Sequence, residues 1–236
     1  MILNGLKNGT LKKLASNKES SKLAQETEDQ TSPWSVYHFE STGQLEDYPA
    51  YSYNEYHVYI YDAIKEPYYY NDVLEIFRNT VPGDIIHIYI NSQGGDLDTL
   101  VSFSSAIDDT EALVICHVDG NAYSAAFILA FMGDDTEISQ FASLMAHNSS
   151  VGCYLANSAN LDKHLKNSKT IYRGMLERYC YMVLTPDEIS GIVDRGEEFY
   201  FSAETIESRL DDWRKIHEND DTCSCCNNTA DDSEEA

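Results

Sequence analysis

The chain has 236 residues, which is enough to bury a sizeable core in one large domain or two small ones. Lysine and arginine number 16 against 40 aspartates and glutamates, a formal net charge of −24, which argues against nucleic-acid binding and against docking on anionic membranes, because clustered basic residues hold phosphate groups. The longest apolar run, residues 125–132, falls far short of a bilayer-spanning helix, so no membrane partner is expected.

The two ends of the chain differ in composition from its centre. Five of the first 22 residues are lysines, and the last 20 are acidic and poor in apolar side chains. Such segments do not bury enough apolar surface to fold alone. We therefore predict a basic, flexible N-terminal arm at residues 1–50, one folded domain at residues 51–216, and a disordered, cysteine-containing tail at residues 217–236.

Strand and helix signals alternate along this body. Apolar runs predict strands, helical periodicity predicts helices, and Val81-Pro82-Gly83-Asp84 predicts a turn. In chain order we expect a strand at 56–61, a helix at 69–79, strands at 85–90 and 112–118 separated by a helix at 97–108, an apolar helix at 124–132, short strands at 137–139 and 143–147, a long helix at 159–184, a helix that Thr185 caps, and a last helix at 203–216. Repeated β-α-β units predict an α/β fold with a parallel sheet.

Two turns carry groups suited to chemistry. Ser124 follows a strand and opens a helix, where unpaired backbone N–H groups favour a developing negative charge, although a serine at this place also serves as an ordinary helix cap. Gly94 and Gly95 follow the preceding strand, where glycines let the backbone approach a ligand closely. His147 can act as a general base, and Asp194 lies further along the chain; each is more often structural when taken alone.

The order of these residues resembles the Clp-type serine peptidases, the proteolytic subunits of Clp proteases, which have a crotonase-like fold. Residues 90–95 read INSQGG, and residues 120–124 read GNAYS. His147 follows Met145-Ala146, and Asp194 lies eight residues before Ser202-Ala203. The short motif around residues 59–64 looks closest to phage-encoded members of the family.

The resemblance implies stacked β-α-β units with a long handle helix and a C-terminal helix. It also implies a serine endopeptidase with a Ser124-His147-Asp194 triad, and an oxyanion hole made by the backbone N–H groups of Gly94, Gly95 and Ala125. The triad acid is the least secure assignment, because a short shift would put Glu197 or Glu198 in its place. This chemistry needs neither a metal nor a cofactor. The expected partners are protein or peptide substrates, further copies in a homo-oligomeric ring, and an ATP-dependent unfoldase.

Three other functions stay open. A crotonase-fold chain with a degraded triad would be a structural or interaction protein, and a phage member could mature capsid or scaffold proteins without an ATPase. A coenzyme-A-using enzyme of the same fold would not need Ser124 and His147 together.

The six cysteines do not form the even framework of a small secreted scaffold, so we expect a reducing, cytoplasmic compartment, that of the host if the protein is viral. Cys223, Cys225 and Cys226 lack a second distant pair, so flexible tail cysteines are favoured over a zinc site.

Overall fold

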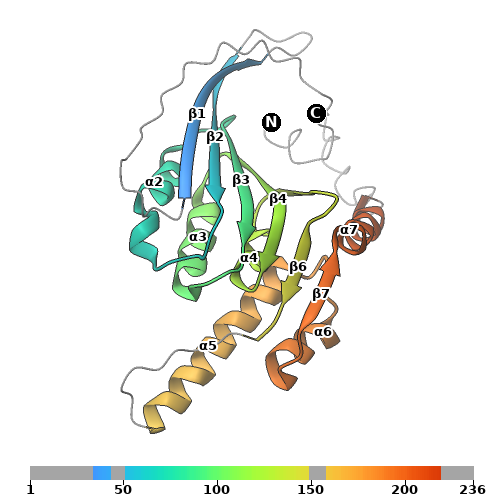
Figure 1. The fold of residues 1–236 in the computed structure, drawn as a ribbon. Coiled ribbons are helices and arrows are strands. Elements are labelled where there is room, and N and C mark those ends of the chain that lie inside the picture. Colours follow the sequence, from blue (N-terminus) through green and yellow to red (C-terminus); the bar gives the residue numbers. More distant parts are fainter. Residues whose placement is uncertain (1–33, 44–50, 149–157, 219–236) are drawn as a thin grey trace, which may run out of the picture.

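A twisted seven-stranded sheet forms the centre of the protein (Figure 1). The computed structural model describes residues 34–43, 51–148 and 158–218. The strands are β1 Trp34–Gly43, β2 Tyr51–Ile60, β3 Ile85–Ser92, β4 Leu113–Tyr123, β5 Asp135–Ile138, β6 Ser143–Ala146 and β7 Phe199–Ser202. Their order is β1-β2-β3-β4-β6-β7, and β5 pairs with β4 off this path. Strands β2, β3, β4 and β6 run parallel, whereas β1 and β7 are antiparallel to their neighbours.

The helices follow the predicted alternation. They are the 3₁₀ turn η1 Pro67–Tyr70, α2 Asn71–Asn79, α3 Leu97–Asp109, α4 Ala125–Leu129, α5 Ser158–Tyr179, α6 Pro186–Ser190, the single π-turn η2 Gly191–Arg195, and α7 Ala203–Glu218. The predicted capping box at Thr185 and Glu188 is present at the start of α6. The long helix predicted to start near residue 159 is α5, the handle that projects from the body in Figure 1. The α/β fold with crotonase-like β-α-β units is therefore confirmed.

Strand β1 lies in the segment that we expected to belong to a flexible arm. Residues 34–43 instead pair with β2 over its whole length, from Trp34 opposite Ile60 to Gly43 opposite Tyr51. The strand alternates, so that Trp34 and Val36 pack against the core while Tyr37 is exposed. The exposed side of this strand also carries a large aromatic residue, Tyr37, which blurs the two-residue alternation of apolar and polar side chains in the sequence. The predicted arm at 1–33 and 44–50 and the tail cysteines at 219–236 lie outside the described residues.

The main core lies between the sheet and the helices. Ile86, Ile88 and Ile90 of β3 are fully buried there, together with Phe77 of α2 and Phe103 of α3. The residues of β3 that point to the other face of the sheet are only half-buried. The apolar run of this strand suggested equal burial on both faces, and the structure does not show it. Within the described ranges, no helix has the length and apolar character needed to span a membrane.

Candidate active site

Ser124 occupies the junction between β4 and α4 in an unusual backbone conformation. Its φ is 57° and its ψ is −120°, and it is the one non-glycine residue with positive φ among the residues that the structure describes. Its N–H donates to the carbonyl oxygen of Met145 at 2.8 Å, which fixes the end of β4 against β6. Such a conformation costs about 1–3 kcal/mol and persists only where the surrounding structure imposes it. Strain of this kind is concentrated at functional sites, so this serine is the first candidate.

The Gly94-Gly95 turn lies directly against this junction. A Cβ atom built on Gly94 would lie 2.4 Å from the carbonyl oxygen of Tyr123 and 2.8 Å from Cβ of Ser124. Gly94 has φ 87° and Gly95 has φ 155°, which L side chains rarely adopt. The predicted proximity of the two turns is therefore present in the fold, and only glycine fits at residue 94.

Polar side chains of the INSQGG segment hold the turn in place. Asn91 accepts a hydrogen bond from the N–H of Asn121 at 3.0 Å, which joins the turn to β4. Ser92 is buried; its hydroxyl donates to the carbonyl oxygen of Asp62 at 2.5 Å and accepts from the N–H of Gly94 at 3.0 Å. The first glycine N–H is thus already bonded within the protein.

Gly95 and Ala125 offer the donors beside Ser124. The bridge between Ile64 and this turn uses the carbonyl of Gly94 and the N–H of Asp96, so the N–H of Gly95 takes no part in it. Ala125 is the first residue of α4, and its N–H has no acceptor within that helix. Two N–H groups next to a strained serine form an arrangement suited to binding an oxyanion.

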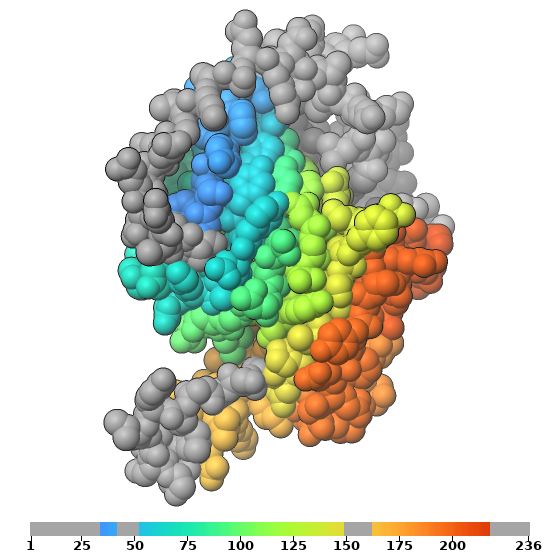
Figure 2. All heavy atoms as spheres, viewed as in Figure 1, coloured from blue at the N-terminus to red at the C-terminus, as the bar shows by residue number. Residues whose placement is uncertain are grey.

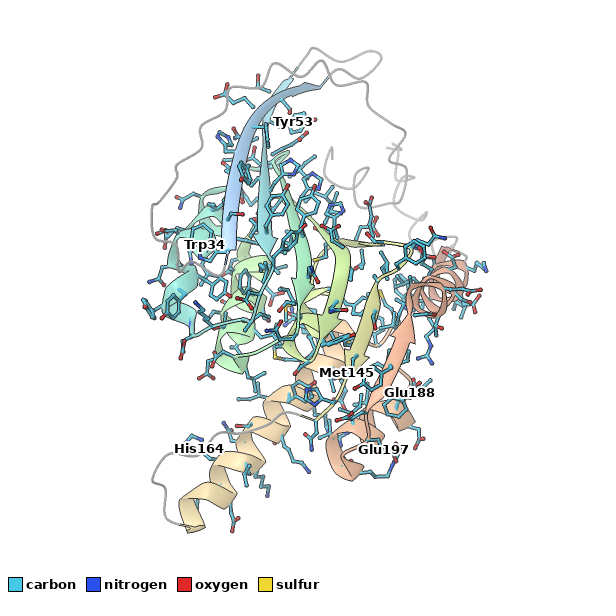
Figure 3. The ribbon with its side chains drawn as sticks, viewed as in Figure 1. Trp34, Tyr53, Met145, His164, Glu188 and Glu197 are labelled. Atoms are coloured by element: carbon cyan, nitrogen blue, oxygen red, sulfur yellow. The ribbon has the colours of Figure 1, made fainter. Side chains whose placement is uncertain are left out.

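His147 lies just beyond the end of β6, near Met145, which Figure 3 labels. Tyr123, the residue before Ser124, is paired with Met145 across β4 and β6. His147 follows Met145 by two residues. The hydroxyl of the buried Tyr172 on α5 donates to the carbonyl oxygen of His147 at 2.7 Å. A core helix therefore fixes the backbone of the candidate base, and its side chain is half-buried.

Asp194 lies in the π-turn η2, and its carboxylate is bound to an arginine of the handle helix. Arg173 donates to Asp194 Oδ2 at 2.5 Å, and the Asp194 side chain is 57% exposed. The hydrogen bond from Arg173 lowers the pKa of Asp194. Between the described residues Asp194 and His147 no hydrogen bond is present.

Glu198 directly precedes β7, and His147 directly follows β6. Strands β6 and β7 are antiparallel, and their last pair is Ala146 opposite Phe199. One further step in the same register brings His147 opposite Glu198. Glu198 is exposed and accepts a long hydrogen bond, 3.4 Å, from the hydroxyl of Tyr200. The four-residue run FYFS before the last helix forms β7. We did not expect a strand there, so the sequence did not show that this segment lies beside β6.

One group of side chains in the described part of the chain has the composition of a metal site. Glu55 and His57 of β2 and His87 of β3 bring their ligand atoms within 4.8 Å of one another. Glu55 is paired with Ile85 at the beginning of β3, whereas Ser124 follows the end of β4. The group therefore lies towards the other end of the parallel strands from the candidate active site.

Comparison with known proteins supports the fold and identifies the family. The fold is similar to a crystal structure of a peptidase from Plasmodium falciparum, with a TM-score of 0.54 and 19% sequence identity over 65% of this chain and 91% of that chain. None of the curated proteins compared with the chain matches it. The family model described as Clp protease matches residues 43–206, which is more than half of the chain and contains both turns, His147 and β7. The chain therefore belongs to the Clp protease family, a family of peptidases.

Proposed function

We propose that this chain is a serine endopeptidase in which Ser124 is the nucleophile and His147 the general base. The observation that carries the proposal is the backbone of Ser124, with φ 57° beside the Gly94-Gly95 turn. A helix-capping serine would adopt an ordinary extended conformation, and no side-chain cap hydrogen bond is made by Ser124. The strain therefore supports a nucleophile rather than a cap.

In the proposed reaction, Ser124 Oγ attacks the carbonyl carbon of a peptide bond and its proton passes to His147. The N–H groups of Gly95 and Ala125 hydrogen-bond to the oxyanion of the tetrahedral intermediate. His147 then protonates the leaving amine, and water hydrolyses the acyl-enzyme with His147 again as base. Loss of one oxyanion donor costs about 10²–10³-fold in turnover in a related type of hydrolase. The N–H of Gly94 is a weaker candidate, because Ser92 already accepts from it.

For the triad acid, the strand register favours Glu198 over Asp194. An acid that orients His147 must lie within hydrogen-bond reach of its ring. Glu198 and His147 are the next residues beyond the last β6–β7 pair, Ala146 opposite Phe199, and the one described partner of Glu198 is a hydroxyl at 3.4 Å. Asp194, which the sequence favoured, is bound to Arg173. Arg173 takes up Oδ2 of Asp194, and no hydrogen bond joins Asp194 to His147 among the described residues, so Asp194 is the second candidate.

We also infer that the active enzyme is a homo-oligomeric ring that takes protein or peptide substrates, with an ATP-dependent unfoldase as partner. Large apolar side chains at the surface support an assembly, among them Phe141, which is 90% exposed, and Ile216, which is 64% exposed. Light scattering at micromolar concentration should give a mass of several chains. A monomer would count against the ring. A phage origin and a cytoplasmic location stay predictions.

The test of the nucleophile is peptide cleavage by Ser124→Ala. We expect turnover to fall by about 10⁶-fold, as in another serine protease, with the melting temperature unchanged or raised. Ser102→Ala is the matched control, because the hydroxyl of Ser102 bonds only its own helix, at the carbonyl of Asp98. Cleavage by Ser124→Ala at the wild-type rate would overturn the assignment of Ser124 as nucleophile. No cleavage by the wild type itself would favour the structural or interaction protein.

A further inference from the structure

The face of the sheet that points away from the helices is lined with histidine and tyrosine rings. His57 of β2 is paired with His87 of β3, and their rings stack with centroids 4.7 Å apart. Tyr89 stacks on His117 of β4, at 4.5 Å. Strands β2, β3 and β4 are at the surface in Figure 2, with no helix in front of them. Four titratable or hydroxyl-bearing rings thus share one face of three neighbouring strands.

Glu55 brings a carboxylate to these rings. It lies two residues before His57, so the two side chains share one face of β2. Glu55 Oε2 is 3.6 Å from His57 Nε2, and both side chains are largely shielded, at 12% and 15% exposure. The hydrogen bond from His57, assisted by others from Tyr53 and Ser41, lowers the pKa of Glu55 to about 2 against the cost of burial. The carboxylate is therefore ionised in this environment and is positioned by several donors.

The second nitrogen of each histidine is held by another side chain. The Tyr89 hydroxyl is 3.0 Å from His57 Nδ1. His87 Nδ1 is 2.9 Å from His117 Nε2, and His117 Nδ1 is 3.0 Å from Glu137. These contacts fit one set of neutral tautomers, in which the Nδ1–H of His117 donates to Glu137 and the Nδ1–H of His87 donates to His117. His57 Nε2 donates to Glu55 in the metal-free protein. Zinc would replace that proton, and His57 would then keep its proton on Nδ1, facing the Tyr89 hydroxyl. His87 would bind through Nε2, because its Nδ1 faces His117.

We propose that Glu55, His57 and His87 bind a zinc ion that joins β2 to β3. Two imidazoles and one carboxylate suit Zn²⁺, whereas Mg²⁺ and Ca²⁺ prefer oxygen ligands. Tetrahedral zinc with bonds of about 2.0–2.2 Å separates its ligand atoms by about 3.4 Å. The 3.6 Å between Glu55 and His57 already fits this value, and all three ligand atoms lie within 4.8 Å of one another. Side-chain movements of about 1 Å complete the set, with water as the fourth ligand.

The site has a structural role, since it lies away from the Ser124 end of the strands. Zinc would cross-link β2 and β3, which are otherwise held together by backbone hydrogen bonds. It would also tie in β1, because Ser41 of β1 bonds Glu55. The net charge of −24 favours cation binding in general. The sequence signal is the alternation of residues 55–61, EYHVYIY, beside residues 85–90, IIHIYI, which puts polar rings on one face of each strand.

The test measures Zn²⁺ binding by metal-free full-length chain in competition with a coloured chelator. The three tail cysteines Cys223, Cys225 and Cys226 are replaced by serine throughout, because thiolates bind zinc strongly. We expect one zinc per chain and a higher melting temperature with Zn²⁺ than with Mg²⁺. Glu55→Gln and His87→Gln should weaken binding at least 100-fold. His164→Gln, on the exposed part of α5, is the control and should bind as the parent does.

Glu137→Gln keeps the proposal testable if the ligand variants fold poorly. Its side chain is 67% exposed, so the substitution spares the core. Replacing the charged acceptor of His117 by an amide weakens the hydrogen-bond chain that ends at His87. Zinc binding should therefore fall, by less than the 10–100-fold expected for a direct partner of a ligand, whereas Glu75→Gln, at a similarly exposed glutamate on α2, should leave it unchanged. If the parent protein, in which the three tail cysteines are replaced by serine, binds no zinc, the proposal is overturned. Equal affinity in the parent, Glu55→Gln and Glu137→Gln would overturn it as well.

Discussion

Gly94→Ala should disable the enzyme without touching any group that takes part in the chemistry. The new Cβ would lie 2.4 Å from the carbonyl oxygen of Tyr123, where ordinary contacts begin at 3.4 Å, so the turn must move by about 1 Å. The φ of +87° adds about 1–3 kcal/mol of backbone strain for any L residue. A displacement of about 1 Å at a reacting centre costs about 10²-fold in rate. We therefore expect kcat/KM for peptide cleavage to fall by about 10²-fold or more.

The assay for this variant combines peptide cleavage with thermal unfolding, and α5 offers its control. Gly174 lies within a helix, and a Cβ built on it meets nothing within 4 Å. Gly174→Ala should raise stability by about 1 kcal/mol through helix propensity and leave cleavage unchanged. Gly94→Ala should lower stability by about 1–3 kcal/mol. Wild-type cleavage by a folded Gly94→Ala protein would refute the close packing of this turn against Ser124.

Two further predictions concern carboxylates. Glu198→Gln should lower turnover by about 10⁴-fold, as loss of the triad acid does in another serine protease, while Asp194→Asn should change it little; the reverse result in the same peptide assay would make Asp194 the acid. Burial opposes ionisation of Glu188, but its hydrogen bonds with Arg209 and Thr185 hold its pKa below the usual 4.5. Glu188 therefore stabilises the fold above pH 4.5, and this stabilisation disappears as the pH falls through the lowered pKa. The melting temperature of Glu188→Gln should accordingly lie below that of the wild type at pH 7, and the gap should close in acid; a gap independent of pH would contradict this.

The sequence predicted the central parallel strands and the two turns well, because each has a strong local signal. Buried strands such as β3 are rich in Ile, and the capping box of α6 is a short-range pattern. Strands β1 and β7 carried weaker signals. Their apolar residues alternate with polar or exposed ones, as in Tyr200, which is 64% exposed, and only the neighbouring strand specifies their register.

The same limit applies to the candidate site. Gly94 and Ser124 were placed in one site through the resemblance of the INSQGG and GNAYS motifs to the Clp-type peptidases, and the structure brings the two turns together. The triad acid stays a prediction, since the spacing from Ser202 does not decide between Asp194 and Glu198. The choice depends on the pairing of β6 with β7 and on Arg173, which lies 21 residues from Asp194 and binds it.

The most direct test of the central claim is the position of a covalent adduct. A fluorophosphonate phosphonylates an activated serine with loss of fluoride, and peptide mapping by mass spectrometry locates the modified residue. We predict one adduct per chain on Ser124, formed at wild-type rate in Ser102→Ala and absent from Ser124→Ala. An adduct on another serine, or no adduct in a chain that cleaves peptides, would contradict the assignment of Ser124 as nucleophile.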